Sequence, residues 1–132
     1  MTAAVMVIAH RGASSYAPEN TLAAFDRALE MGVRHIELDV ALTSDSHTVV
    51  IHDDKVDRTT NGCGLVTSHT LAALRALDAG SWFGAQFEGE RIPTFDEVLA
   101  RYNGRVHIHT EIKGKSESLS QRTAPIMNQR SR

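Results

Sequence analysis

This sequence has only one cysteine, and it lacks long apolar runs and an excess of positive charge. The single cysteine, Cys63, rules out an internal disulfide and favours a reducing, cytoplasmic location. The apolar opening at residues 3–9 is too short to span a membrane and lacks the basic flank of a secretory signal. The formal net charge of −2 argues against a nucleic-acid-binding protein, which is usually basic.

The size and charge distribution of the 132 residues fit one domain with a weakly structured end. The chain is 42% hydrophobic, which is enough for a core. Residues 1–112 carry 9 basic and 15 acidic groups, and a metal cation would relieve any inward-facing cluster of that charge. Residues 116–132 are serine-rich and basic with no apolar period, which predicts a loose tail.

Apolar patterns predict strands that alternate with helices. A strand is expected at residues 5–10, where the short apolar run predicts burial on both faces. Further strands are expected at residues 33–40, 49–52 and 105–113. Helices are expected from residues 18–21 to a cap at Gly32, over residues 70–77, and over residues 94–102, where Thr94 and Glu97 form a capping box. This order predicts an α/β fold with parallel strands, whose site lies at their carboxyl ends.

Carboxylates end two of the predicted strands. Glu37 and Asp39 are two residues apart, so they project to the same face of their strand, and Glu111 repeats the pattern on the last strand. Three such groups offer the hard oxygen ligands that suit Mg²⁺ or Ca²⁺. The alternatives are solvated acids on a strand edge and a salt bridge between Glu111 and Lys113.

Histidines and cations also lie at strand ends. His10 and His52 can serve as acid and base near neutral pH, although a lone histidine at such a place is more often structural. Arg11 and Lys113 can bind phosphate, or balance the charge of the carboxylates, or both.

The remaining histidines are expected to have no role in the site. His107 and His109 share a face with Glu111, but a zinc site would need tight geometry from them. We therefore predict that they are not ligands and that His35, His47 and His69 are surface or packing residues.

Eight short segments, taken in order, resemble the glycerophosphodiester phosphodiesterase family. No segment is decisive alone, but the ordered set is highly specific and covers residues 5 to about 114. The segments are His10-Arg11-Gly12-Ala13, Pro18-Glu19-Asn20-Thr21, Glu37-Leu38-Asp39-Val40, Val49-Val50-Ile51-His52-Asp53, Asp57-Arg58-Thr59-Thr60-Asn61-Gly62, Leu77-Asp78-Ala79-Gly80 with Trp82-Phe83, Ile92-Pro93-Thr94 and Glu111-Ile112-Lys113.

The resemblance implies a TIM (β/α)8 barrel with a small insertion after the second or third strand. It also implies metal-dependent hydrolysis of glycerophosphodiesters to sn-glycerol 3-phosphate and an alcohol. The residues that match the family's site are His10 and His52 as the acid–base pair, Glu37, Asp39 and Glu111 as ligands of Ca²⁺ or Mg²⁺, Arg11 and Lys113 as phosphate contacts, and Glu19 as a supporting acid.

The chain is shorter than the barrel that the resemblance implies, which takes roughly 230 residues or more. About four barrel strands are expected, so we predict half a barrel over residues 1–114 and a tail over residues 115–132. An open half barrel exposes sheet edges, which homodimerisation could close. The function classes left open are an active phosphodiesterase, a truncated non-catalytic fragment or interaction module, and a lysophospholipase D-like activity.

Overall fold

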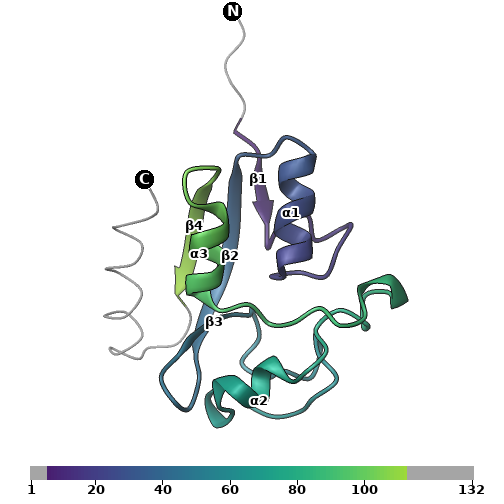
Figure 1. The fold of residues 1–132 in the computed structure, drawn as a ribbon, viewed down its shortest axis with the longest axis vertical. Helices are drawn as coiled ribbons and strands as arrows, with labels where there is room; N and C mark the ends of the chain where they lie inside the picture. The colour runs from purple at the N-terminus through teal and green to yellow at the C-terminus, as the bar shows by residue number, and fades with distance from the viewer. Residues whose placement is uncertain (1–5, 113–132) are drawn as a thin grey trace, which may run out of the picture.

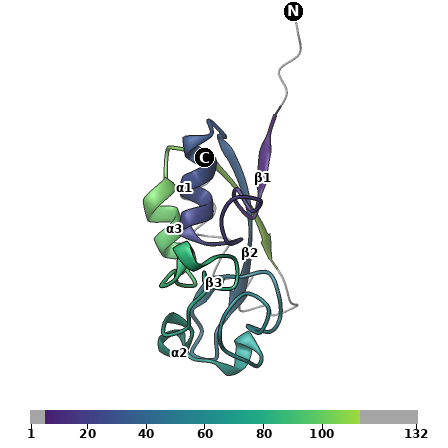
Figure 2. The ribbon, with the colours of Figure 1, turned by 90° about the vertical axis from the view of Figure 1, so that its right-hand side faces the viewer.

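The computed structural model describes residues 6–112, which form a four-stranded sheet with two helices on one side (Figures 1 and 2). The strands are β1 (Ile8–His10), β2 (His35–Leu42), β3 (Thr48–Val50) and β4 (His107–Ile112). The helices are α1 (Leu22–Glu30), α2 (Leu71–Arg75) and α3 (Phe95–Tyr102), with short 3-10 turns η1 (Val66–Ser68) and η2 (Ala85–Phe87). Lys113 and the predicted tail lie outside the described residues.

Three of the strands are parallel and have the order expected of consecutive barrel units. β2 is central and pairs in parallel with β1, where Ile8 lies opposite His35, and with β4, where His35 lies opposite His107. Helix α1 joins β1 to β2, and α3 precedes β4. The described residues therefore hold three parallel strands, one fewer than the four expected.

The prediction of a parallel strand at residues 49–52 is wrong. β3 runs antiparallel to β2, with Val50 opposite Val40 and Thr48 opposite Leu42. The turn at residues 43–47 joins the two strands directly, and it is too short for the crossover that a parallel neighbour needs. β3 therefore leads the chain back along β2, and the amide of Ile51 donates to the carbonyl of Asp39 at 3.0 Å.

The two helices beside the sheet begin and end as their sequences predict. The hydroxyl of Thr21 caps α1 by accepting from the amide of Ala24, and Gly32 follows the helix with a φ of 85°. The capping box of Thr94 and Glu97 is present at the start of α3. Buried side chains of both helices pack on those of β2 and β4 in one core: Phe25, Ala28, Ile36, Leu38, Val40, Phe95, Val98, Leu99, Tyr102 and Ile108.

Residues 43–94 form an insertion between β2 and α3, as the family resemblance implied. It has a separate small core that includes Val49, Ile51, Val56, Val66 and Leu74. Arg75 ties the insertion to α3, because its guanidinium donates to the carboxylate of Glu97 at 2.9 and 3.2 Å. The small core and this ion pair together hold the loops of the insertion beside the sheet.

The start of the sheet is more exposed than predicted. The opening strand was expected to be buried on both faces, but Met6, Val7 and Ile8 are 59%, 58% and 40% exposed. Within the described part of the chain β1 pairs with β2 alone, so its other edge has no neighbour. Between residues 6 and 112, no helix is long and apolar enough to cross a membrane.

Candidate active site

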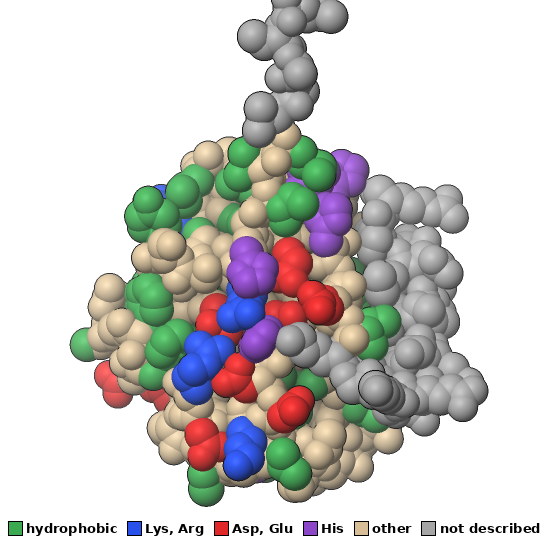
Figure 3. Space-filling model, turned by 180° about the vertical axis from the view of Figure 1, so that it is seen from behind, with side chains coloured by type: hydrophobic (Ala, Val, Ile, Leu, Met, Phe, Trp, Pro, Cys, Tyr) green, Lys and Arg blue, Asp and Glu red, His purple; other side chains and the backbone are tan. Residues whose placement is uncertain are grey.

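The three predicted carboxylates meet on the face of the sheet that turns away from α1 and α3. The parallel register of β2 and β4 puts Asp39 opposite Glu111, and Glu37 lies two residues earlier on the same face of β2. Carboxylate oxygens of the three residues lie within 4.8 Å of one another. Figure 3 shows acidic, basic and histidine side chains crowded on this face. The structure therefore brings the three predicted carboxylates together, as the strand alternation indicated.

The carboxylate cluster fits a divalent cation. Glu37 Oε1 is buried and has no hydrogen-bond donor among residues 6–112. Burial and then the charge of Asp39 raise the pKa of the Glu37 carboxyl. An all-oxygen donor set suits hard ions of the Mg²⁺ and Ca²⁺ class. These three residues are therefore compatible with a divalent metal.

Asp39 is the most firmly held of the three. It is 1% exposed, accepts a hydrogen bond from Asn20 Nδ2 at 3.1 Å, and lies 3.5 Å from Arg11 Nε. Arg11 and Asn20 have φ values of 60° and 56°, a conformation that costs on the order of 1–3 kcal/mol for residues other than glycine. The amide of Asn20 donates to the carbonyl of Arg11 at 2.9 Å, which ties the two strained residues together.

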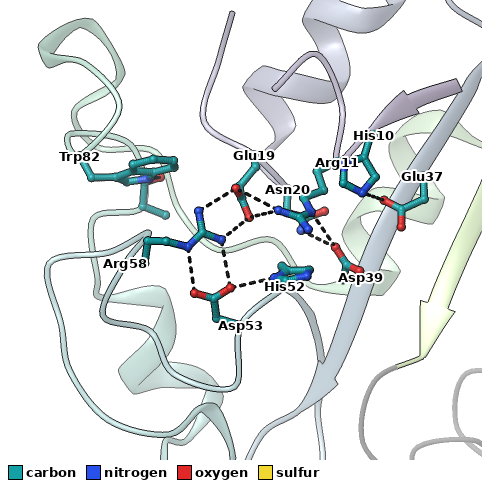
Figure 4. Close-up of polar contacts among 11 residues, drawn as sticks. His10, Arg11, Glu19, Asn20, Glu37, Asp39, His52, Asp53, Arg58 and Trp82 are labelled. Atoms are coloured by element: carbon teal, nitrogen blue, oxygen red, sulfur yellow. Dashed lines mark hydrogen bonds and ion pairs between the residues drawn. The ribbon is translucent and has the colours of Figure 1, made fainter. Parts of the chain in front are cut away.

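Both predicted histidines reach this site, from different parts of the fold (Figure 4). His10 ends β1, and its largely exposed ring places Nε2 3.9 Å from Glu37 Oε1. His52 follows β3, and its Nδ1 lies 2.8 Å from Asp53 Oδ1. The antiparallel return of β3 brings His52 to the level of Asp39, so its position does not come from a parallel strand end.

A chain of charged groups links His52 to the carboxylates, and Arg58 is its centre (Figure 4). The Arg58 guanidinium donates to both oxygens of Asp53 at 2.9 and 3.0 Å and to both oxygens of Glu19 at 3.0 and 2.9 Å. Glu19 also accepts weak hydrogen bonds from Arg11 at 3.4 and 3.5 Å. Hydrogen bonds from Arg58 hold the pKa of Asp53 well below its usual range.

Arg58 and Asn20 were not predicted as site residues, although both lie within segments that carry the family resemblance. Glu19, predicted as a supporting acid, contacts two arginines of the site. Of the eight predicted site residues, seven lie in the described range and gather in this region, and Lys113 falls outside it. The roles assigned to the individual residues stay predictions.

Comparison with known proteins shows what this arrangement resembles. Residues 10–129 match the model of the glycerophosphoryl diester phosphodiesterase family. The chain is 62% identical over 94 residues to a glycerophosphodiester phosphodiesterase of Caldanaerobacter subterraneus subsp. tengcongensis, a match that covers 71% of this chain and 39% of that protein.

Two solved structures have a closely similar fold. A phosphodiesterase of Oleispira antarctica, in complex with the product sn-glycerol-3-phosphate, matches with a TM-score of 0.88 and 38% identity, over 97% of this chain and 53% of that one. A glycerophosphodiester phosphodiesterase of Agrobacterium tumefaciens matches with a TM-score of 0.87 and 40% identity, over 92% and 52%. These matches confirm the predicted TIM-barrel fold class. The chain spans about half of the solved structures and less of the sequence relative.

Proposed function

Because the chain belongs to the glycerophosphoryl diester phosphodiesterase family, we propose that its site hydrolyses glycerophosphodiesters to sn-glycerol 3-phosphate and an alcohol. The observation that carries the proposal is the meeting of three carboxylates with two histidines and Arg11 on one face of the sheet. The Oleispira antarctica relative, whose structure is a complex with the product sn-glycerol-3-phosphate, supports the choice of substrate class.

Glu37, Asp39 and Glu111 are the proposed ligands of Ca²⁺ or Mg²⁺. When bound, either ion would supply positive charge against the phosphate oxygens in the transition state. Arg11 and Lys113 are the proposed phosphate contacts. Arg11 is suited to this role because Asp39 and Glu19 hold its guanidinium at the rim of the carboxylate cluster.

His10 and His52 are proposed to move the protons. One imidazole removes the proton from the glycerol 2-hydroxyl, whose oxygen then attacks phosphorus, and the other protonates the departing alcohol oxygen. Water opens the resulting cyclic phosphate with the two roles reversed. Asp53 positions His52 for this role, because its carboxylate oxygen lies 2.8 Å from His52 Nδ1 and orients the ring.

Hydrolysis of glycerophosphocholine, followed with and without a chelator, tests the proposal. We expect activity that disappears on chelation and returns with Ca²⁺ or Mg²⁺, and that disappears in His10→Ala and His52→Ala. His47→Ala is the matched control, because His47 lies in the turn between β2 and β3. Near-normal activity of His10→Ala, or no activity of the folded chain with either metal, would show the proposal to be wrong.

The alternative functions are not favoured. The family model and the relatives named above support glycerophosphodiester hydrolysis rather than a non-catalytic interaction module or a lysophospholipase D-like activity. A cytoplasmic location stays a prediction that rests on the single cysteine, and the division of the chain near residue 114 also stays a prediction.

We also propose that a second copy of the chain covers the open edge of β1. The support is an apolar surface at this edge, where Met6, Val7 and Ile8 are exposed. Beside it lies a hollow of about 240 Å³, lined by residues that include Ala9, Tyr16 and Met31. A parallel strand or an apolar helix face from a partner would bury this surface.

A further inference from the structure

Three histidines gather on the same face of the sheet as the carboxylates, one step nearer the start of β2 and β4. The register puts His35 opposite His107 and Glu37 opposite His109. His35 Nδ1 lies 3.0 Å from His109 Nε2, and the His35 ring stacks on His107 with centroids 4.6 Å apart and planes at 15°. We propose that His35, His107 and His109 form a second metal site, for a divalent transition ion such as Zn²⁺ or Ni²⁺.

The geometry of the His35–His109 pair is close to that of two ligands of one ion. Two imidazole nitrogens bound to tetrahedral Zn²⁺ at 2.0–2.1 Å are about 3.3 Å apart. The observed 3.0 Å needs only a small side-chain movement to reach that value. His107, whose ring stacks on His35, is the third candidate ligand and would have to rotate for one of its nitrogens to reach the same ion. His107 and His109 are exposed and His35 is half-buried, so an ion has access to them.

The ligand type separates this site from the carboxylate cluster. Imidazole nitrogen prefers borderline ions such as Zn²⁺ and Ni²⁺, whereas carboxylate oxygen prefers Mg²⁺ and Ca²⁺. Neighbouring sites on one sheet can therefore hold different ions. An ion bound to His35 and His109 would join β2 to β4, the two strands that carry the carboxylates, and would stabilise the folded chain by mass action. This inference does not depend on the proposed function.

The sequence alone did not indicate this grouping. It showed that His107 and His109 share a face, but His35 lies 72 residues before His107 in the chain and joins them only through the pairing of β2 with β4. The competing explanation is a hydrogen bond between two neutral imidazoles, in which one ring donates its N–H to the other. That pair would need no ion, and a binding experiment separates the two explanations.

The test is a calorimetric titration of the full chain, purified without a histidine tag, with Ni²⁺ in the presence of saturating Mg²⁺. We expect one Ni²⁺ per chain and a higher melting temperature with Ni²⁺. In His35→Gln and His109→Gln the affinity should fall by more than the roughly 10–100-fold that loss of an outer-shell partner costs. His107→Gln should weaken binding as well.

Two controls identify the site. His47→Gln removes a histidine from the β2–β3 turn and should leave the Ni²⁺ affinity unchanged. Glu111→Gln removes a carboxylate of the neighbouring cluster and should leave it nearly unchanged. Circular dichroism checks that each variant folds, and the exposed position of His109 makes His109→Gln the safer variant. No Ni²⁺ binding by the wild-type chain, equal binding by His109→Gln, or loss of binding in Glu111→Gln would overturn the inference.

Discussion

Arg58 joins two acidic residues that each contact a proposed participant in the reaction. Asp53 contacts His52, and Glu19 contacts Arg11, so Arg58 fixes a proton-transfer group and a phosphate contact at once. We expect Arg58→Met to lower kcat on the order of 100-fold, because small misplacements of reacting groups can cost that much. The decrease should lie mainly in kcat rather than KM, because Arg58 touches neither of the proposed reacting groups directly.

Arg91→Met is the matched control for this prediction. Arg91 is also in the insertion, and its guanidinium makes a long hydrogen bond of 3.4 Å to the carbonyl of Leu77. Steady-state kinetics compare kcat and KM of the two variants. An unchanged kcat in Arg58→Met would contradict the positioning role.

The stability of the folded chain depends on pH through Asp53, and the lowered pKa of this residue sets the direction of the dependence. Hydrogen bonds from Arg58 keep this pKa below the ordinary value of about 3.9, so the folded state binds this proton less readily than the unfolded state. The stabilisation is therefore complete above the ordinary value and is lost as pH falls through the lower folded value. In urea unfolding, Asp53→Asn should be less stable than wild type at pH 7. The difference should shrink between about pH 5 and pH 3; a difference that stays constant over that range would exclude this linkage.

The candidate metal ligands could be predicted from the sequence, whereas the residues that position the site could not. Glu37, Asp39 and Glu111 were predictable, because strand alternation fixes which side chains share a face. The roles of Arg58 and Asn20 were not predictable, because they depend on partners 39 and 19 residues away in the chain. Contacts of this kind depend on the fold, and no local pattern encodes them.

Helix α3 depends on a local signal at its first turn. The hydroxyl of Thr94 accepts from the amide of Glu97 at 3.0 Å, and Glu97 Oε1 accepts from the amide of Thr94 at 3.1 Å. We expect Thr94→Ala to lower the free energy of unfolding by about 1 kcal/mol, and Thr94→Ser to lower it far less, because serine keeps the cap. Chemical denaturation measures both, and equal losses in the two variants would argue against the capping contribution.

The helices were predictable because their caps and apolar stripes lie within a few residues of one another. The direction of β3 was missed for the opposite reason. A short apolar run such as residues 49–52 looks the same in a parallel or an antiparallel strand, and the length of the connection to β2 decides between them. Reading the turn at residues 43–47 as a hairpin would have corrected the topology from sequence.

At the scale of the molecule, the open edge of β1 is the proposed contact between two copies of the chain. Val7 is 58% exposed and precedes the β1–β2 ladder, so Val7→Lys should leave the fold intact while placing a charge on the proposed contact. We expect a dimer for the wild-type chain and a monomer for Val7→Lys by size-exclusion chromatography with light scattering. Leu65→Lys, which changes an exposed apolar residue of the insertion, should remain dimeric. A monomeric wild-type chain would show that a second copy does not cover this edge.

The two cores of the molecule divide the proposed proton carriers between them. His10 ends β1, in the sheet that packs on the large core. His52 belongs to the insertion, whose small core includes Val56 and Leu74. Heat that loosens the smaller core would separate the two histidines while α1 and α3 remain packed on β2. On heating, activity should therefore be lost at a lower temperature than the helical circular dichroism signal. Shortening Leu74 to leave a cavity in the small core should widen the gap between the inactivation temperature and the melting temperature. The insertion would then set the highest temperature at which the proposed activity persists, and the barrel strands would set the melting temperature of the chain.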